Sequence, residues 1–439
     1  MAETSVGQLT HSRVLKIAFP IVLSNATVPI LGVVDTAVVG QLGQAAPIGA
    51  VGIGAVVLGA IYWMFGFLRM GTTGMTAQAH GAGDREEVIA LLIRALMIGL
   101  AAGFVLILLQ RPLFWAAFLV SPASNEVEGM AQDYMRVRVW SAPAAIALYG
   151  VNGWLIAQER TGAVLALQIW MNGLNIGLDV WFVLGLGWGV EGVALATFVA
   201  EWSGLALGLW LCRSALVGRM WRNWAVVFER SRIRAMMLVN RDILLRSLML
   251  QVIFLSFLFF GADFGDVTLA ANRILMQFLY VTGFALDGFA FSAETLVGQA
   301  LGAGNRAALR RSAVLTSFWG LVCVIGLSVA FWLGGGVIID LMTTAPEVRS
   351  EARVYLVYMI IAPLLGIASW MLDGIFIGAT RTRDMRNMMV LSLAIYAAAI
   401  AVLLPFFGNH GLWLALLISF VARGVTLGMR YPALEKQAG

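Results

Sequence analysis

The chain alternates long apolar runs with short polar stretches along its whole length. A helix needs about 20 mostly apolar residues to cross the hydrocarbon core of a bilayer. Runs of that size recur throughout, without the apolar–polar alternation that marks the strands of a membrane β-barrel. The pattern predicts twelve helical spans, near residues 14–39, 47–70, 88–110, 130–156, 163–186, 190–212, 236–260, 267–297, 309–335, 353–378, 386–407 and 411–430.

The composition supports the same class of protein. Hydrophobic residues make up 60% of the chain and charged residues 12%, whereas a soluble domain has about 45–50% and about 25%. The mean hydropathy is +0.87. We therefore expect an all-α integral membrane protein that crosses the bilayer many times.

The basic residues indicate which ends of the spans face the cytoplasm. Arg85, Arg160, Arg306 and Arg381 fall in alternate loops, and the connecting stretch "GRMWRNWAVVFERSRIR" is also basic. The positive-inside rule places this stretch and both chain termini in the cytoplasm. The net charge of +5 is then explained without a nucleic-acid partner. We expect the stretch, which carries tryptophans, to lie on the inner membrane surface as a connector.

Two pieces of sequence recur at one constant spacing of 221 residues (299 − 78 and 373 − 152), which we call the repeat offset. "QAHGAGDR" (78–85) matches "QALGAGNR" (299–306), and "NGWLIAQERT" (152–161) matches "DGIFIGATRT" (373–382). This repeat predicts two six-span halves of the same orientation, a parallel arrangement known from transporter folds. The expected domains are an N-terminal six-helix bundle (1–212), a basic cytoplasmic linker (213–235) and a C-terminal six-helix bundle (236–439).

Two acids inside predicted spans are the first candidates for chemistry. An Asp at the centre of a spanning helix costs about 2.5–3.5 kcal/mol, so such residues usually face an ion or substrate pathway. Asp35 lies in the first span, and Asn175 and Asp179 share one face of the fifth, four residues apart. With Thr197 of the sixth span these side chains would form an oxygen-rich site, which suits Na⁺ or a shared proton. The alternative is a polar cluster that only fixes helix packing.

Prolines and further acids complete the set of candidates. Pro20 and Pro29 lie in the first span, where each frees a backbone carbonyl and allows a bend, so the acid of that span sits on a movable helix. In the second half, Asp287 and Glu294 share a helical face seven residues apart, and Asp373 lies in the tenth span. Asp287 and Glu294 could pair with Arg69 or Asn272 as packing groups, and Glu201 and Arg423 are expected to be structural.

Several motifs resemble the multidrug and toxic compound extrusion (MATE) family, most closely its DinF branch. The resemblance covers essentially all twelve spans. It implies two six-helix bundles around a V-shaped cleft and the export of cationic or amphipathic compounds in exchange for H⁺ or Na⁺. It rests on "VDTAVVGQLG", "TAQAHGAGDR", "NGWLIAQERTG", "NIGLDVWFVLGLGWGVEGVALAT" and "LDGFAFSAETLVGQALGAGNR".

The resemblance also assigns roles to individual residues. Pro20 matches the proline at which the first span of the family is thought to bend. Other branches place coupling acids in the second bundle, where Asp373 takes the place of Asn152 but Ile400 stands at the counterpart of Asp179. That absence favours the first bundle. The residues matched to its cation-coupling network are Asp35, Asp179, Asn175, Thr197, Asn152 and Tyr134.

Two other transport functions stay open, a flippase for lipid-linked precursors and an exporter of organic anions such as citrate. A membrane enzyme would need a metal-chelating acid motif, a histidine cluster or a Ser/His pair, and the sequence offers none. We expect no cofactor beyond the coupling ion and no metal site beyond a Na⁺ at Asp35 and its neighbours. The expected partners are a small organic substrate and the bilayer, with the protein a monomer of the bacterial inner membrane.

Overall fold

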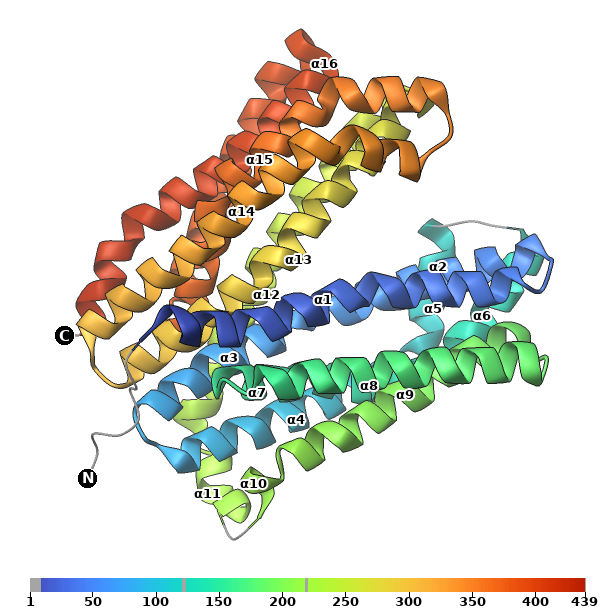
Figure 1. Cartoon of the computed structure of the whole chain (residues 1–439). Helices are drawn as coiled ribbons and strands as arrows, with labels where there is room; N and C mark the ends of the chain where they lie inside the picture. Colours follow the sequence, from blue (N-terminus) through green and yellow to red (C-terminus); the bar gives the residue numbers. More distant parts are fainter. Residues whose placement is uncertain (1–8, 121–123, 218–219, 439) are drawn as a thin grey trace. The chain divides into compact units, whose positions relative to one another are not determined.

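The computed structural model describes residues 9–120, 124–217 and 220–438. Helices form nearly all of this part of the chain (Figure 1). The first half contains α1 (His11–Gly40), α2 (Ala45–Trp63), α3 (Gly66–Gly81), α4 (Arg85–Leu108), α5 (Gln110–Val120), α6 (Asn125–Arg138), α7 (Ala142–Ala157), α8 (Thr161–Asp179) and α9 (Gly189–Leu211). The second half contains α12 (Arg230–Ala262), α13 (Asp266–Gly302), α14 (Arg306–Met342), α15 (Pro346–Gly378) and α16 (Thr382–Glu435).

Short helices join the longer ones. A 3₁₀ turn, η1 (Val139–Ser141), links α6 to α7, and a π-helical segment, η2 (Val180–Gly185), continues α8. The predicted linker at 213–235 forms α10 (Arg213–Leu216), the 3₁₀ turn η3 (Met220–Arg222) and α11 (Trp224–Val227), followed by the start of α12. Residues 218–219 of that linker, and residues 1–8 and 439 at the termini, lie outside the described residues.

The described residues contain eleven helical stretches that are long and apolar enough to cross a membrane. The last of them, α16, has 54 residues, which at 1.5 Å per residue is about 80 Å, far more than the hydrocarbon thickness of about 30 Å. Its backbone leaves the helical conformation at Gly408, where φ is 53°. Gly187, one repeat offset earlier, has φ of 71° and separates η2 from α9. We therefore count α16 as two spans, and the predicted twelve-span fold is confirmed.

Local backbone geometry repeats at the same offset as the sequence. The two non-glycine residues with positive φ in the described part are Glu159 (60°) and Thr380 (52°), which are separated by the repeat offset. Each follows the end of a helix. The next backbone N–H then donates to the carbonyl oxygen five residues earlier, at 2.9 Å in the first repeat and 3.0 Å in the second. The halves thus end equivalent helices in the same way, which supports the two-repeat fold.

By packing, the helices fall into two compact units. The N-terminal unit comprises Leu23–Thr76 and Asp84–Met236; the C-terminal unit comprises the residues before Leu23, Ala77–Gly83 and the chain from Met237 onward. Helices α1, α3 and α12 therefore each contribute to both units. The predicted domains at 1–212 and 236–439 describe the sequence repeat, and that division stays a prediction.

Within the C-terminal unit, the ends of α3 and α13 make a reciprocal backbone contact. A Cβ atom on Gly81 would overlap the carbonyl oxygen of Gln299, and one on Gly302 would overlap that of Gln78. No side chain fits against a carbonyl oxygen so close, so both positions need glycine. The Gln78 amide also donates to the carbonyl oxygen of Gly378 at 2.8 Å. The duplicated "QAHGAG" and "QALGAG" motifs are therefore the two sides of one contact.

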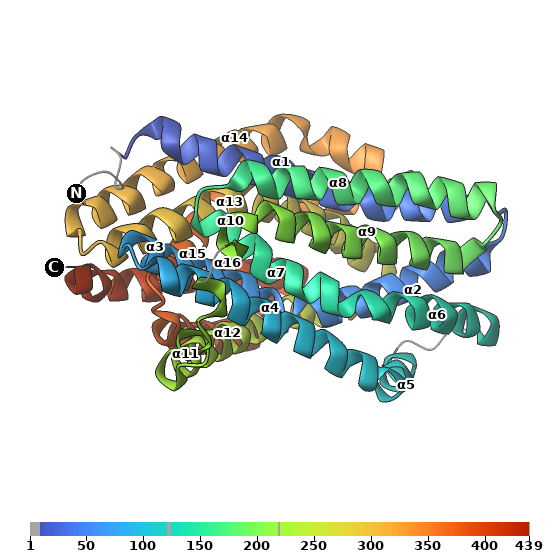
Figure 2. The ribbon, with the colours of Figure 1, turned by 90° about the horizontal axis from the view of Figure 1, so that it is seen from below.

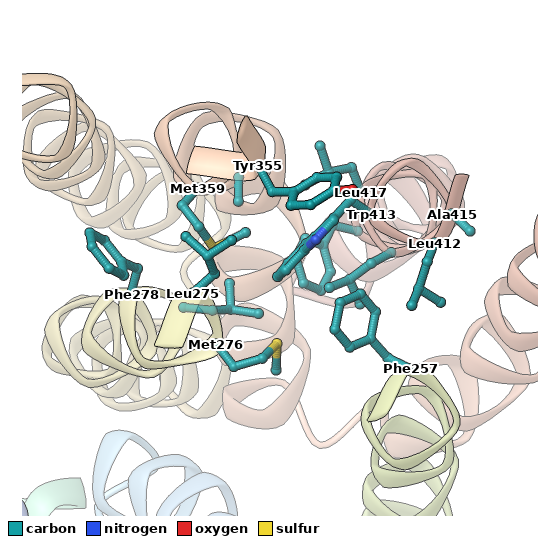
Figure 3. Packing of buried hydrophobic residues seen from close by; sticks show 14 of the residues in the cluster. Phe257, Leu275, Met276, Phe278, Tyr355, Met359, Leu412, Trp413, Ala415 and Leu417 are labelled. Atoms are coloured by element: carbon teal, nitrogen blue, oxygen red, sulfur yellow. The ribbon is translucent and has the colours of Figure 1, made fainter. Parts of the chain in front are cut away.

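The core of the C-terminal unit is aromatic with a buried polar group. The rings of Phe257 and Trp413 meet edge to face at 4.5 Å (Figure 3). The Trp413 indole donates to Asn272 Oδ1 at 3.0 Å, and Asn272 Nδ2 donates to Asn409 Oδ1 at 2.8 Å. The expectation that Asn272 pairs with Asp287 is wrong, because 15 residues along the continuous α13 place them about 22 Å apart.

Candidate cation site

Asp35 and Asp179 come together in the N-terminal unit. Asp35 lies on the second half of α1 and is 9% exposed, and Asp179 is the last residue of α8 and is fully buried. Their carboxyl groups are within hydrogen-bonding reach of each other. Two carboxylates only accept hydrogen bonds, so this contact requires a proton or a cation between the oxygens. The structure thus pairs the two acids, while their role in coupling stays a prediction.

Asn175, one turn before Asp179 on α8, contacts that acid, and Thr197 of the neighbouring helix α9 contacts Asn175. The views of Figures 1 and 2 both show α8 and α9 side by side. With its amide oriented to satisfy both neighbours, Asn175 Nδ2 donates to Asp179 Oδ2 at 3.1 Å, and its Oδ1 accepts from the Thr197 hydroxyl at 3.1 Å. The other Asp179 oxygen, Oδ1, is buried and receives no hydrogen bond from the described residues. One acceptor therefore remains for a proton or a cation.

A polar stripe on α8 explains how the site meets α1. Gln168 donates to Asn172 Oδ1 at 2.9 Å, and Asn172 Nδ2 donates to the Thr27 hydroxyl of α1 at 3.0 Å. Residues spaced three and four apart share a helical face, so the same stripe continues to Asp179. Immediately after that residue the helix widens into η2, and π-helical turns often occur at functional sites.

Tyr134 and Arg138 extend the site along α6. Tyr134 is buried and interacts electrostatically with Arg138 and with Asp35. Arg138 donates to both carboxylate oxygens of Glu201, at 2.8 and 2.9 Å. A partly buried bidentate ion pair of this kind has a fixed geometry. Arg138 therefore stands as a fixed positive charge near Asp35, and the sequence analysis did not single it out.

The other candidates of the first half lie on α7 and α1. Asn152, on α7, has a buried Oδ1 that finds no hydrogen-bond partner in the described part of the chain, so this atom does not bond to either acid. Pro20 and Pro29 both lie inside α1, which continues as one helix from His11 to Gly40. The helix passes from the C-terminal to the N-terminal unit between Val22 and Leu23, two residues after Pro20.

The acids of the second half have arginine partners. Asp373 is ion-paired with Arg246, and Arg423 lies 3.7 Å from the same carboxylate oxygen. All three side chains are buried. Arg246 also interacts electrostatically with Glu294 and Asp287. In this cluster of the C-terminal unit, arginine side chains supply positive charge next to the acids.

Comparison with known proteins places these features in a family. The MatE family model matches residues 20–181 and 243–403. DNA damage-inducible protein F of Escherichia coli is 39% identical over 425 residues, which cover 94% of this chain and 90% of that protein. The probable multidrug resistance protein NorM of Pseudomonas aeruginosa is 26% identical over 462 residues, covering 98% and 91%.

Solved structures show the same fold at low sequence identity. A MATE protein in the bent conformation matches with a TM-score of 0.88 at 20% identity, covering 97% of this chain and 96% of the other. The Vibrio cholerae MATE transporter VcmN in the bent form matches with a TM-score of 0.85 at 21% identity, covering 98% and 97%. The helix arrangement described above is thus shared over nearly the full length of both proteins.

Proposed function

The chain belongs to the MATE family of multidrug efflux transporters, and we propose that it is a cation-coupled antiporter that exports cationic or amphipathic organic compounds. The observation that carries the proposal is the meeting of Asp35 and Asp179 inside an apolar helical unit. We place the protein in the bacterial inner membrane with both termini in the cytoplasm, because the arginines gather in alternate loops.

The two acids supply a physical reason for coupling. One acid is on α1 and the other on α8, so a cation or proton between them draws the two helices together, and its loss leaves two like charges that repel. Since α1 also belongs to the C-terminal unit up to Val22, a shift of its second half bends the helix near Pro20. A ligand moves a conformational equilibrium only by its different affinity for the two states. Here the cation favours one form of α1, and the exported compound favours the other.

In the described second half, the positions that correspond to the acid site hold neutral side chains. The counterparts of Asp35 and Asn175 at the repeat offset are Ser256 and Tyr396, whose hydroxyl oxygens lie 3.1 Å apart in a neutral hydrogen bond. Asp373 already has arginine partners. The two guanidinium groups at this carboxylate would repel an added cation, and we therefore assign coupling to the first half and a structural role to Asp373, Asp287 and Glu294.

We propose a proton as the coupling ion, and Asn175 is the side chain on which a proton and Na⁺ place different demands. With Nδ2 directed at Asp179, the amide presents a donor to the acid pair. A Na⁺ ion needs oxygen ligands, so it would require the amide to turn over. The two ions therefore make different demands on the same side chain.

The test is transport by the purified protein in proteoliposomes, with a pH gradient and a Na⁺ gradient imposed separately. We expect a pH gradient to drive export of a fluorescent organic cation such as ethidium, and Asp35→Asn and Asp179→Asn each to reduce this transport to the background of empty vesicles. The matched control is Asp133→Asn, which removes an exposed acid from α6 in the same unit. Full gradient-driven transport in both site variants would refute the proposal, and driven export of citrate but not of ethidium would replace its substrate class.

A further inference from the structure

The C-terminal unit has an open pocket between the first turns of α14 and the end of α16. Its volume is about 680 Å³. Three arginines line it, Arg306, Arg310 and Arg311, and one turn further along the same helix lies Val314, which is 60% exposed. The 37 residues of α14 span about 55 Å, more than the bilayer core. Its charged first turns and the apolar residues beyond them therefore lie at a membrane–water boundary.

The charge of the pocket is not balanced by its own residues. Arg306 Nε and Arg310 Nε each lie 3.9 Å from the same oxygen of Glu435. Ion pairs this long, with arginine side chains 54% and 74% exposed, contribute little. Three guanidinium groups against one carboxylate leave an excess of two positive charges among the lining residues.

In the first repeat the equivalent face of α4 is buried. The counterparts of Arg310 and Arg311 on α4 are Ile89 and Ala90, which are 6% and 2% exposed. Arg94, one turn further on, donates from Nε to the carbonyl oxygen of Val227 at 2.8 Å, so the connector packs against this face. In the second repeat the equivalent face carries arginines and stays open. The difference between the repeats thus lies in charge and in exposure together.

We propose that this pocket binds the phosphate of an anionic phospholipid headgroup. Guanidinium groups match phosphate oxygens in geometry and charge, and basic pockets at the ends of spanning helices bind anionic headgroups. Val314, exposed one turn from Arg310, provides an apolar surface for the start of an acyl chain. A free phosphate ion would not use that surface, which is why we assign a lipid.

The test measures lipid binding to the full-length protein by native mass spectrometry, with phosphatidylglycerol and phosphatidylcholine at matched concentrations. Arg310→Gln/Arg311→Gln is compared with Arg85→Gln/Arg383→Gln, which removes the same charge from two exposed arginines at the starts of α4 and α16. Each basic residue near an anionic lipid contributes about a fivefold change, so we expect phosphatidylglycerol to bind about 30-fold more weakly to the first variant. The second variant is expected to bind as the wild type does, and phosphatidylcholine binding is expected not to change.

A third variant changes affinity in the opposite direction. Glu435→Gln removes the carboxylate that competes for the arginines, and we expect phosphatidylglycerol to bind about fivefold more tightly. Inorganic phosphate at millimolar concentration is expected not to displace the lipid. Unchanged affinity in Arg310→Gln/Arg311→Gln, equal loss in both double variants, or full displacement by inorganic phosphate would each overturn the proposal.

Discussion

The two halves of the chain satisfy buried charge in opposite ways. In the first half Asp35 meets Asp179, acid against acid, and the helices provide Asn175 and Thr197 as neutral partners. In the second half Asp373 lies against Arg246 and Arg423. A duplicated helix arrangement therefore carries one centre that needs an ion from outside and one that contains its own counter-charge. Coupling to an ion gradient requires the first kind of centre, because only there does an arriving cation change the balance of forces.

The largest expected effect tests this comparison with the same substitution in both halves. Asp373→Asn removes the carboxylate that lies against two buried arginines, and we expect it to lower the free energy of unfolding by about 3–5 kcal/mol. Asp35→Asn removes one of two like charges and should cost less than about 1 kcal/mol. Denaturant unfolding of both variants in one detergent measures the difference. Equal losses would show that the two centres do not differ in the way described.

A second prediction concerns the contact that joins the duplicated motifs. Gly81→Ala and Gly302→Ala each place a methyl group against a backbone carbonyl, and we expect each to destabilise the protein by about 1–3 kcal/mol. The two losses should be similar, because the contact is reciprocal. Gly52→Ala is the control, since nothing lies within 4 Å of its Cβ position on α2. It should be neutral or stabilise by up to about 1 kcal/mol. A loss from Gly52→Ala as large as the others would contradict the packing argument.

The smallest expected effect comes from the neutral counterpart of the acid site. Tyr396→Phe removes one hydroxyl from the Ser256–Tyr396 pair, and we expect a loss of about 0.5–1.5 kcal/mol of stability. Gradient-driven transport should be retained, because no charge changes there. Thermal unfolding and the proteoliposome assay on one preparation measure both quantities. Abolished transport in a folded Tyr396→Phe protein would show that the second half takes part in coupling.

Much of the fold could be predicted from sequence because the bilayer fixes the length of a span. The helices begin and end within a few residues of most predicted spans, and the repeat offset recurs in the backbone at Gly187 and Gly408. Helix α5 was missed because its 11 residues are too short to span and adjoin the third apolar run. Its existence depends on packing, which an apolar window does not register.

The geometry of the site was predictable only where it follows from one helix. Asn175 and Asp179 share a face by spacing alone, whereas Asp35 and Thr197 were candidates only as polar residues inside other predicted spans. Arg138 was missed because its partner Glu201 is 63 residues away and on another helix. A basic residue inside the predicted fourth span was the available signal. Which faces of two separate helices meet is decided by tertiary packing, and hydropathy does not report it.

The mutual approach of Gly81 to Gln299 and of Gly302 to Gln78 has the form of an isologous interface, in which each side presents the same surface to the other. In a homodimer of half-length subunits, every substitution would change both sides of this contact at once. A single polypeptide that carries both copies escapes this constraint. One copy can hold acids at positions where the other holds the neutral residues Ser256 and Ile400, while the contact between the two motifs stays unchanged.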